Sequence, residues 1–207
     1  MSDQTATLLV DLIISLDGYA SAEGWPGWWG LEGPEYLAWL DEEAKKDVTT
    51  LMGANTYRLM SGMSGQAGEA DSGFSKEEGD SLAGLAAVPK VIFSSTLKEP
   101  LAWPNSELVS GDAVEAVREM KQTRTGTLST LGSLSLCRSL LSAGLVDRYR
   151  LVVFPVITGK TGRERIYDGY PDVALDMVES RTFDGRLQML EYVPRVIDTP
   201  LGRGGGG

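Results

Sequence analysis

Short apolar runs that alternate with helix-like segments are the feature that most limits how this 207-residue chain can fold. Each run is apolar, rich in β-formers and too short for a typical helix, as expected of strands inside a sheet. The expected strands lie at residues 7–14, 48–52, 90–95, 106–110, 127–133 (a strand running into a turn) and 146–157. Helical patterns occur at residues 34–46, 56–61, 113–122 and 134–144. This alternation predicts an α/β sandwich with a mixed, largely parallel sheet.

The last third of the chain departs from this alternation. Residues 173–193 indicate two antiparallel strands joined at Asp184-Gly185, a strong hairpin signal. Residues 62–80 are rich in Gly, Ser and acids, and predict a surface loop or a partly mobile flap. Because the sequence shows no repeat and no clear linker, we expect a single domain over residues 1–195. A flexible Gly-rich tail is expected over residues 196–207.

Composition argues against several classes of function. A net charge of −10 opposes binding to nucleic acid or to an anionic membrane surface, and no window approaches the length of an apolar membrane span. The first residues lack the pattern of a secretion signal, and a single Cys fits a reducing compartment, so a cytoplasmic location is expected.

The chain contains no His, which removes Ser-His-Asp and Cys-His schemes, His general bases and the usual zinc sites. Metal sites made of carboxylates alone stay open, but the sequence has no D-x-D-x-D-G loop, so we expect no metal. If the protein is an enzyme, its chemistry is expected to come from a cofactor or from Asp, Glu, Tyr, Lys or Ser.

Three of the predicted strands end in similar turns. The residues concerned are Gly53, Asn55 and Thr56 after the second strand, Ser94, Ser95 and Thr96 after the third, and Gly132 and Ser133 before the last helix. Ligands of parallel sheets bind beyond the carboxyl ends of the strands, where helix N-termini offer free N–H groups to phosphates. Each turn alone is more often an ordinary turn with an N-cap, whereas the three together favour a nucleotide site. The common G-x-G-x-x-G fingerprint is absent.

Two features of the loop after the first strand have both a structural and a functional interpretation. Asp17, with Gly18 beside it in "SLDGY", forms either an Asp-Gly turn or a carboxylate placed to bind or protonate a substrate. The tryptophans of this region are core or dimer contacts, or else they wall a pocket for a planar ligand. They are Trp25, Trp28, Trp29 and Trp39. The sequence leaves both choices open.

These motifs together carry a family resemblance. The chain resembles the dihydrofolate reductase-like superfamily, and most closely the branch with the reductase domain of the bifunctional riboflavin-biosynthesis deaminase-reductase. The resemblance covers most of residues 7–193 and rests on the order and spacing of "SLDGY", "MGANTY", "FSSTL", "LGSLSL" and "AGLVDRYRLVVFPVITGKTG". It implies a dihydrofolate reductase-like three-layer α/β/α sandwich, with a mixed, mostly parallel sheet and a C-terminal antiparallel hairpin. It also implies a homodimer.

The resemblance implies a reductase that transfers hydride from NADPH to a small heterocyclic or carbonyl/imine substrate, similar to 5-amino-6-(5-phosphoribosylamino)uracil reductase. The residues then expected at the cofactor are Gly53, Thr56, Ser94, Ser95, Thr96, Leu131, Gly132, Ser133 and Leu134. The residues expected at the substrate are Asp17, Gly18, Trp25 and Tyr36, with Asp17 as the catalytic residue.

The sequence departs from the family pattern at two positions. Tyr36 stands where true dihydrofolate reductases carry an acidic residue, so reduction of dihydrofolate is not expected. Ala54 stands where the family usually has an Arg that contacts the cofactor phosphates, which leaves NADH open beside NADPH. The departures motivate an alternative function, a nucleotide- or ligand-binding protein of the same fold that has lost catalysis. A purely structural dimer is a third, weaker alternative.

Overall fold

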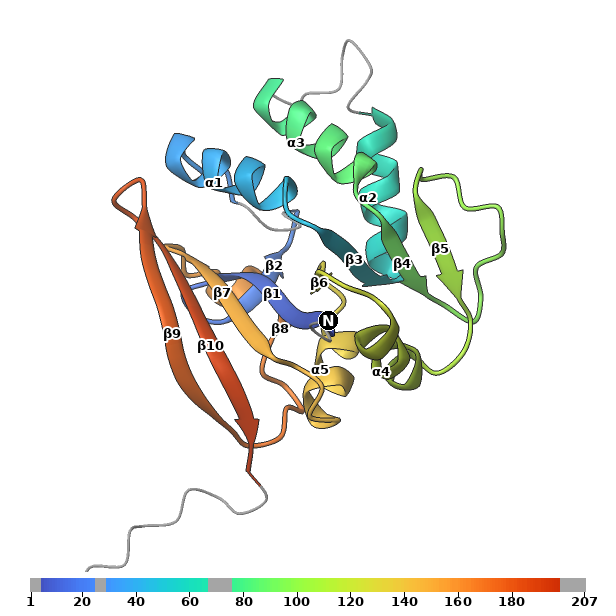
Figure 1. Cartoon of the computed structure of the whole chain (residues 1–207). Coiled ribbons are helices and arrows are strands. Elements are labelled where there is room, and N and C mark those ends of the chain that lie inside the picture. Colours follow the sequence, from blue (N-terminus) through green and yellow to red (C-terminus); the bar gives the residue numbers. More distant parts are fainter. Residues whose placement is uncertain (1–4, 25–28, 67–75, 198–207) are drawn as a thin grey trace, which may run out of the picture.

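The computed structural model describes residues 5–24, 29–66 and 76–197, and an eight-stranded sheet forms its centre (Figure 1). Its strands are β1 (Thr7–Ser15), β3 (Val48–Gly53), β4 (Lys90–Phe93), β5 (Ser106–Val109), β6 (Thr127–Thr130), β7 (Arg148–Phe154), β9 (Val173–Phe183) and β10 (Leu187–Val196). They are ordered β5-β4-β3-β6-β1-β7-β10-β9. The first six pair in parallel, whereas β10 is antiparallel to both β7 and β9. The mostly parallel sheet with a C-terminal hairpin is therefore confirmed.

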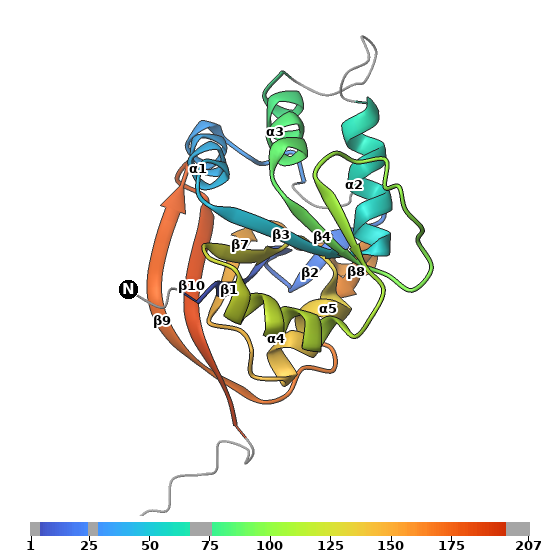
Figure 2. The ribbon, with the colours of Figure 1, turned by 45° about the vertical axis from the view of Figure 1, so that its right-hand side comes forward.

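Helices cover both faces of this sheet. They are α1 (Pro34–Ala44), α2 (Ala54–Gln66), α3 (Lys76–Ala87), α4 (Ala113–Thr123) and α5 (Leu134–Ser142). In Figures 1 and 2, α1, α2 and α3 lie over one face, and α4 and α5 lie over the other. The side chains of β1 divide accordingly. Leu8 and Val10 are buried in the cluster that contains α4 and α5, whereas Ile13 packs with aromatic residues of α1. This is the expected three-layer sandwich.

The prediction of a loop over residues 62–80 was wrong at both ends of that segment. Its first part continues α2 and its last part belongs to α3, whereas residues 67–75 lie outside the described residues. The helix α3 is held by its apolar side chains, because Leu82 is buried and Leu85 and Ala86 pack against the core. The i, i+3, i+4 spacing of these three residues was the available signal, and the high content of Gly and Ser obscured it.

A small second sheet was also missed. It pairs β2 (Tyr19–Ala22) with β8 (Gly162–Arg165) in antiparallel fashion. The first of these strands lies in the loop expected after the first strand, and no element was predicted at residues 162–165. A Cβ atom at Gly162 would lie 2.8 Å from the ring of Tyr19, so only glycine allows this close approach. Neither strand has an alternating apolar pattern, and their pairing spans most of the chain. Local sequence therefore gave no sign of it.

Two helix ends have the capping residues that local sequence favours. The Asp112 carboxylate accepts hydrogen bonds from the N–H groups of Val114 (2.8 Å) and Glu115 (3.1 Å) and so caps α4. Glu115 does not complete a capping box with Asp112, since its side chain pairs with Arg118. Gly144 has a φ of 66° directly after the last turn of α5.

The hairpin turn at Asp184-Gly185 also serves another element. Both residues have positive φ, 52° and 65°, as a tight hairpin turn requires. The Asp184 carboxylate then accepts hydrogen bonds from the N–H groups of Glu35 (3.0 Å) and Tyr36 (3.2 Å), at the start of α1. A Cβ atom on Gly33 would lie 2.3 Å from this carboxylate, so glycine leaves the room for it. The C-terminal hairpin thus fixes the N-terminus of α1.

A buried lysine fixes the end of α3. The Lys90 side chain is almost fully buried, and its Nζ donates hydrogen bonds to the carbonyl oxygens of Leu85, Ala86 and Val88 at 3.0, 3.0 and 2.6 Å. The ammonium also lies 4.7 Å from the centre of the Trp103 ring. Desolvation lowers the pKa of Lys90 to about 8. The last carbonyl groups of α3 therefore have partners.

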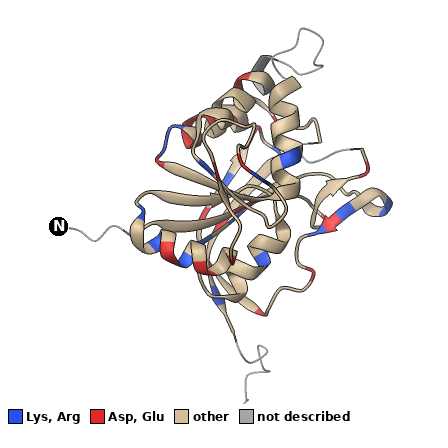
Figure 3. Ribbon diagram, turned by 90° about the vertical axis from the view of Figure 1, so that its right-hand side faces the viewer, with Lys and Arg blue, Asp and Glu red and all other residues tan. Residues whose placement is uncertain are grey.

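Two whole-chain features complete the fold. None of the helices within the described ranges is long and apolar enough to cross a membrane. Basic and acidic residues are interspersed over the ribbon (Figure 3).

Candidate active site

Two of the predicted turns meet at the carboxyl edge of the sheet. Because β3 and β6 are parallel neighbours, the turn that opens α2 lies beside the turn that opens α5. The Ser133 Oγ accepts a hydrogen bond from the N–H of Gly53 at 2.7 Å and lies 2.8 Å from the Thr56 Oγ1. One hydroxyl therefore ties both turns together.

The second of these turns has an unusual backbone. Gly132 and Ser133 have φ values of 54° and 57°, in the left-handed region that favours glycine. A Cβ atom at Gly132 would lie 3.2 Å from the Thr56 Oγ1, so the Thr56 side chain would have to shift by a few tenths of an ångström to make room for it. The absence of a side chain leaves the backbone open to close approach by a ligand. We call the set of Gly53, Thr56, Gly132 and Ser133 the turn junction.

A cavity of about 1420 Å³ begins at the turn junction. Residues of α1, α2, α3 and the start of α5 line it. Six of the nine residues predicted for the cofactor line it: Gly53, Thr56, Leu131, Gly132, Ser133 and Leu134. Its volume exceeds the roughly 300–1,000 Å³ of a typical small-molecule pocket. It therefore has room for more than one small ligand.

The other three predicted cofactor residues lie further along the same edge and outside the cavity wall. Gly53 pairs with Phe93, so the turn after β4 lies next to the first turn of α2. The Ser94 Oγ accepts hydrogen bonds from the N–H groups of Thr96 and Leu97, both at 3.1 Å. The hydroxyls of Ser95 and Thr96 belong to exposed residues.

Asp17, the predicted catalytic residue, does not line the cavity. Its carboxylate accepts hydrogen bonds from the Ser15 Oγ at 2.7 Å and from the N–H groups of Thr158 and Gly159 at 3.1 and 2.9 Å. Desolvation opposes the charged form, but these hydrogen bonds outweigh it and lower the pKa of Asp17 to about 2. Gly18 is buried and is also absent from the cavity wall. Asp17 therefore holds the segment after β7 and is a poor source of protons.

Of the predicted substrate residues, Tyr36 lines the cavity and Trp25 lies outside the described residues. The Tyr36 ring stacks on Trp39 at 5.7 Å between centroids and meets Phe154 edge-on at the same distance. Burial and the nearby Asp11 carboxylate raise the pKa of the Tyr36 phenol above its ordinary value, so it stays neutral.

The structure answers part of the question about the tryptophans. Trp39 is buried and also lines the cavity, so it is both core and pocket wall. Trp29 packs on Phe154 with centroids 5.6 Å apart. Trp28, like Trp25, lies outside the described residues.

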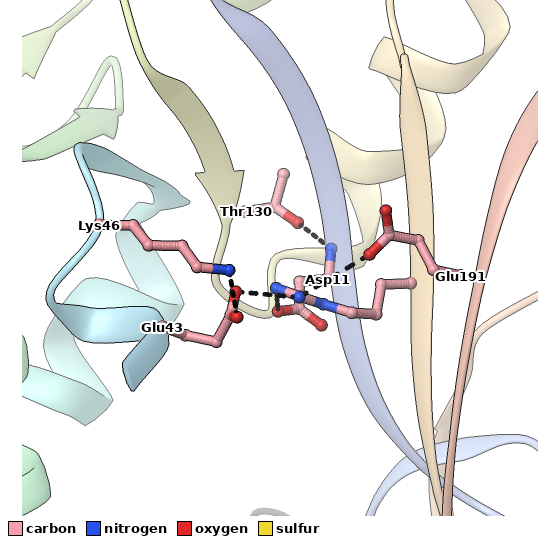
Figure 4. Close-up of polar contacts among 6 residues, drawn as sticks. Asp11, Glu43, Lys46, Thr130 and Glu191 are labelled. Carbon is pink, nitrogen blue, oxygen red and sulfur yellow. Dashed lines mark hydrogen bonds and ion pairs between the residues drawn. The ribbon is translucent and has the colours of Figure 1, made fainter. Parts of the chain in front are cut away.

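The cavity wall also carries a charge cluster that sequence reasoning missed (Figure 4). Arg150 on β7 pairs with Asp11 on β1 at 2.8 Å, with Glu43 on α1 at 3.1 Å and with Glu191 on β10 at 3.8 Å. The Arg150 side chain is only 8% exposed, and its guanidinium carbon lies 4.9 Å from the centre of the Trp39 ring. We call these four charged residues the Arg150 cluster.

The charges of the cluster stabilise one another. Desolvation disfavours the Arg150 cation, but Asp11 and Glu43 outweigh it and raise the pKa of Arg150 above its ordinary value. Glu43 behaves in the opposite sense. Desolvation raises its pKa, but the hydrogen bond from Lys46 and the Arg150 charge outweigh this and lower it. The sequence contained a sign of this cluster, because Asp11 interrupts the apolar run of β1 and Arg150 interrupts that of β7.

The cavity therefore joins two chemically different regions. One end offers backbone N–H groups, hydroxyls and uncovered glycine backbone. The other end combines aromatic walls with a charged floor. Within the described ranges, no group of three or more Cys, Asp or Glu side chains is arranged to hold a metal ion.

Comparison with known proteins places this geometry in a family. A model of the RibD C-terminal domain matches residues 6–189. Among curated proteins, the chain is 24% identical over 185 residues to the uncharacterized protein YyaP of Bacillus subtilis (strain 168), covering 89% of this chain and 93% of the relative.

Solved structures share the fold. A putative riboflavin biosynthesis protein from Shewanella sp. PV-4 superposes with a TM-score of 0.65 at 17% identity, over 91% of this chain and 99% of its own. A diaminohydroxyphosphoribosylaminopyrimidine deaminase/5-amino-6-(5-phosphoribosylamino)uracil reductase from Thermotoga maritima gives 0.61 at 14% identity, over 92% of this chain and 57% of its own. Dihydrofolate reductase from Enterococcus faecalis, complexed with NADP(H), gives 0.56 at 12% identity, over 91% and 96%. The chain belongs to the RibD C-terminal domain family and has the dihydrofolate reductase-like fold.

Proposed function

We propose that this protein is an NADPH-dependent reductase that acts on a small heterocyclic or carbonyl/imine substrate. The observation that carries the proposal is the turn junction at the mouth of the cavity, where two parallel strands end at uncovered glycines and a shared serine hydroxyl. Its relatives support the choice. The Thermotoga maritima protein is named as a 5-amino-6-(5-phosphoribosylamino)uracil reductase, and the Enterococcus faecalis structure contains NADP(H).

The residues present fit a dinucleotide cofactor. Gly132 leaves a space that a Cβ atom would fill, and the turns that open α2 and α5 present N–H groups and hydroxyls suited to a pyrophosphate. When bound, the dihydronicotinamide supplies the hydride. The residues assigned to the pyrophosphate are Gly53, Thr56, Gly132 and Ser133.

The other end of the cavity suits the substrate. Tyr36 and Trp39 offer aromatic surface to a planar ring, while Asp11 and Glu191 offer acceptors to polar substituents. The side chain of Asp11 is 27% exposed, so a bound ring can reach it. Asp17 is strongly acidic and lies outside the cavity wall, so the proton for the reduced product comes from a bound water in this proposed reaction.

Cofactor binding tests the proposal directly. Titration of the protein with NADPH and NADH, followed by tryptophan fluorescence, is expected to show saturable binding of at least one of them. Ser133→Ala is expected to weaken binding several-fold, because it removes the hydroxyl that joins the two turns. The control Ser139→Ala removes an exposed hydroxyl from the same helix and is expected to leave binding unchanged. Absence of saturable binding of either cofactor contradicts the proposal.

One observation favours a second candidate, a binding protein of the same fold without catalysis. The carboxylate expected to be catalytic is engaged in hydrogen bonds that fix the loop after β7. An absorbance assay distinguishes the reductase from the binding protein. It follows the loss of dihydronicotinamide absorbance in the presence of 5-amino-6-(5-phosphoribosylamino)uracil or a related imine. Turnover excludes the second candidate. Saturable cofactor binding without turnover of any such substrate favours it.

A further inference from the structure

Three aromatic rings hold the Tyr36 side chain at the aromatic end of the cavity. Its ring centroid lies 5.7 Å from the centroid of Trp39 and equally far from those of Phe154 and Phe183. The residue is only 1% exposed. Its backbone is fixed as well, since the N–H of Tyr36 donates a hydrogen bond to the Asp184 carboxylate at 3.2 Å. The side chain is therefore packed in one position before a ligand binds.

The Tyr36 hydroxyl has no hydrogen-bond partner within the described part of the chain, although the residue lines the cavity. It is not sealed inside the protein, in contrast to the unpartnered Nε1 of Trp103. A phenol that has lost its water and gained no partner destabilises the fold, and a phenylalanine would pack here without that cost. A fixed, unpartnered hydroxyl in the wall of a cavity indicates that an atom of a ligand is its partner.

The groups around this phenol keep it protonated. Burial raises the pKa of Tyr36 above its ordinary value, the charges of Asp11 and Glu32 raise it further, and Arg150 opposes them. The hydroxyl therefore carries its proton throughout the neutral pH range. A neutral phenol can donate a hydrogen bond at every such pH, so it is a permanent donor in the cavity wall.

The carboxylates at this end already have a cation. The Arg150 guanidinium donates hydrogen bonds to Asp11 at 2.8 Å and to Glu43 at 3.1 Å (Figure 4). The Glu32 Oε2 is sealed from solvent. A cationic ring would have to compete with Arg150 for these carboxylates and would lie close to its positive charge. A neutral ring that accepts a hydrogen bond from Tyr36 meets neither obstacle.

We propose that the Tyr36 hydroxyl donates a hydrogen bond to the substrate, and that the protein thereby selects neutral rings with a carbonyl oxygen or an unprotonated ring nitrogen at this position. The inference rests on the proposed function and deepens it by giving the polarity of the substrate. A carboxylate at position 36 would require donors on the ring, whereas a tyrosine requires an acceptor. A protonated amidine-type ring leaves the hydroxyl without a partner and is disfavoured.

Two pyrimidines with the same ring and opposite substituents test this polarity. Uracil presents carbonyl oxygens, whereas 2,4-diaminopyrimidine presents amino groups and is readily protonated. Ligand-observed NMR titration of the full chain, without cofactor, is expected to give a Kd for uracil in the millimolar range that is usual for so small a ligand. Tyr36→Phe removes only the hydroxyl and is expected to raise this Kd about fivefold, while the Kd of 2,4-diaminopyrimidine stays within about twofold.

Two controls restrict the effect to the Tyr36 hydroxyl. Tyr167→Phe removes the hydroxyl of a tyrosine that is 46% exposed and lies outside the cavity wall, so it is expected to leave the Kd of both pyrimidines unchanged. The Kd of NADPH, followed by tryptophan fluorescence, is expected to be the same in Tyr36→Phe and in the wild type, because the turn junction lies at the other end of the cavity. Circular dichroism checks that both variants are folded.

The outcomes separate this inference from the proposed function. A uracil Kd that is unchanged in Tyr36→Phe, or a wild type that does not bind uracil, overturns the role of the hydroxyl and leaves the reductase standing. Equal weakening of both pyrimidines also overturns it, since the loss would then come from altered ring packing. A wild type that binds uracil through Tyr36 but binds neither NADPH nor NADH overturns the reductase and leaves the polarity of this end of the cavity intact.

Discussion

The carboxylate of Asp17 accepts its backbone hydrogen bonds from a segment that begins 141 positions later in the sequence. It joins the end of β1 to the turn after β7, and both of its oxygens are used. The "SLDGY" motif therefore marks a structural contact at this position. The family resemblance implied that this motif supplies the catalytic carboxylate. One substitution at Asp17 therefore distinguishes a structural role from a catalytic role.

Asp17→Asn is expected to lower the free energy of unfolding by about 1 kcal/mol at neutral pH, because an amide accepts with one oxygen only. The folded-state pKa of about 2 lies below the ordinary value of 3.8, so ionised Asp17 stabilises the folded state above that ordinary value. This contribution is lost as pH falls through about 2. The difference between wild type and variant in urea unfolding is therefore expected to shrink as the pH is lowered below about 4.

The control for this prediction is Asp176→Asn, which removes an exposed carboxylate on β9 and is expected to change stability little. A variant of Asp17 that keeps wild-type stability but loses turnover contradicts the structural role. Such a result supports the catalytic prediction instead.

Among elements, the attachment of α1 to the sheet depends on two contacts that are distant in sequence. Asp184 of the hairpin caps its N-terminus, and Glu43 near its C-terminus pairs with Arg150 on β7. Both contacts lie at the wall of the cavity or next to it, and they set where Tyr36 and Trp39 stand. The aromatic and charged end of the cavity is thus built by α1, β7 and β10 together.

Arg150→Met is expected to lower the free energy of unfolding by about 3–5 kcal/mol, because it leaves three carboxylates without their buried cation. Chemical denaturation measures the effect. Arg148→Met is the matched control, since Arg148 lies two positions earlier on the same strand face, is 42% exposed and has one ion pair of 3.5 Å. Its expected cost is at most about 1 kcal/mol.

A double variant checks the physical reason for this cost. In Asp11→Asn with Arg150→Met, one of the unpaired charges is removed, so the total loss is expected to be smaller than the sum of the two single losses. Additive losses would show that the charges do not act on one another.

For the molecule as a whole, the sequence predicts best what depends on neighbours in the chain. The hairpin at Asp184-Gly185, the cap at Asp112 and the glycine that follows α5 all follow from a few adjacent residues. The turn junction could also be predicted from the sequence, because parallel strands bring their carboxyl ends to the same edge of a sheet. The fold class and the turns at Gly53 and Gly132 come from such rules, whereas Leu131 and Leu134, which also line the cavity, were expected from the family resemblance.

What the sequence did not predict depends on contacts between distant positions. Arg150 meets Glu43 and Asp11 across 107 and 139 positions, and the pairing of β2 with β8 joins opposite parts of the chain. Asp17 illustrates the limit, since its neighbours in sequence suggest an exposed turn and only the distant Thr158 and Gly159 reveal its hydrogen bonds. Patterns of apolar residues place elements in layers but do not specify which polar side chains meet between them.

The homodimer implied by the family resemblance stays a prediction. We expect its interface at the free edge of the sheet, which is strand β9. Strand β9 pairs only with β10 among the described strands and is exposed along most of its length. Figure 1 shows this long strand at the outside of the molecule. Its exposed apolar residues are Leu175, Met177 and Val178. An edge strand with open N–H and C=O groups pairs readily with a second strand.

Pairing of β9 with its copy around a two-fold axis would pair the open N–H and C=O groups of both chains and bring these apolar residues beside their copies. We therefore expect light scattering after size exclusion to give the mass of a dimer for the wild type, and a lower mass for Met177→Lys, which places a charge on the shared edge. Ile157→Lys is the control, because Ile157 is 72% exposed but lies outside the sheet, and it is expected to stay dimeric. A monomeric wild type contradicts the homodimer, and a Met177→Lys variant that remains a dimer contradicts its location on β9.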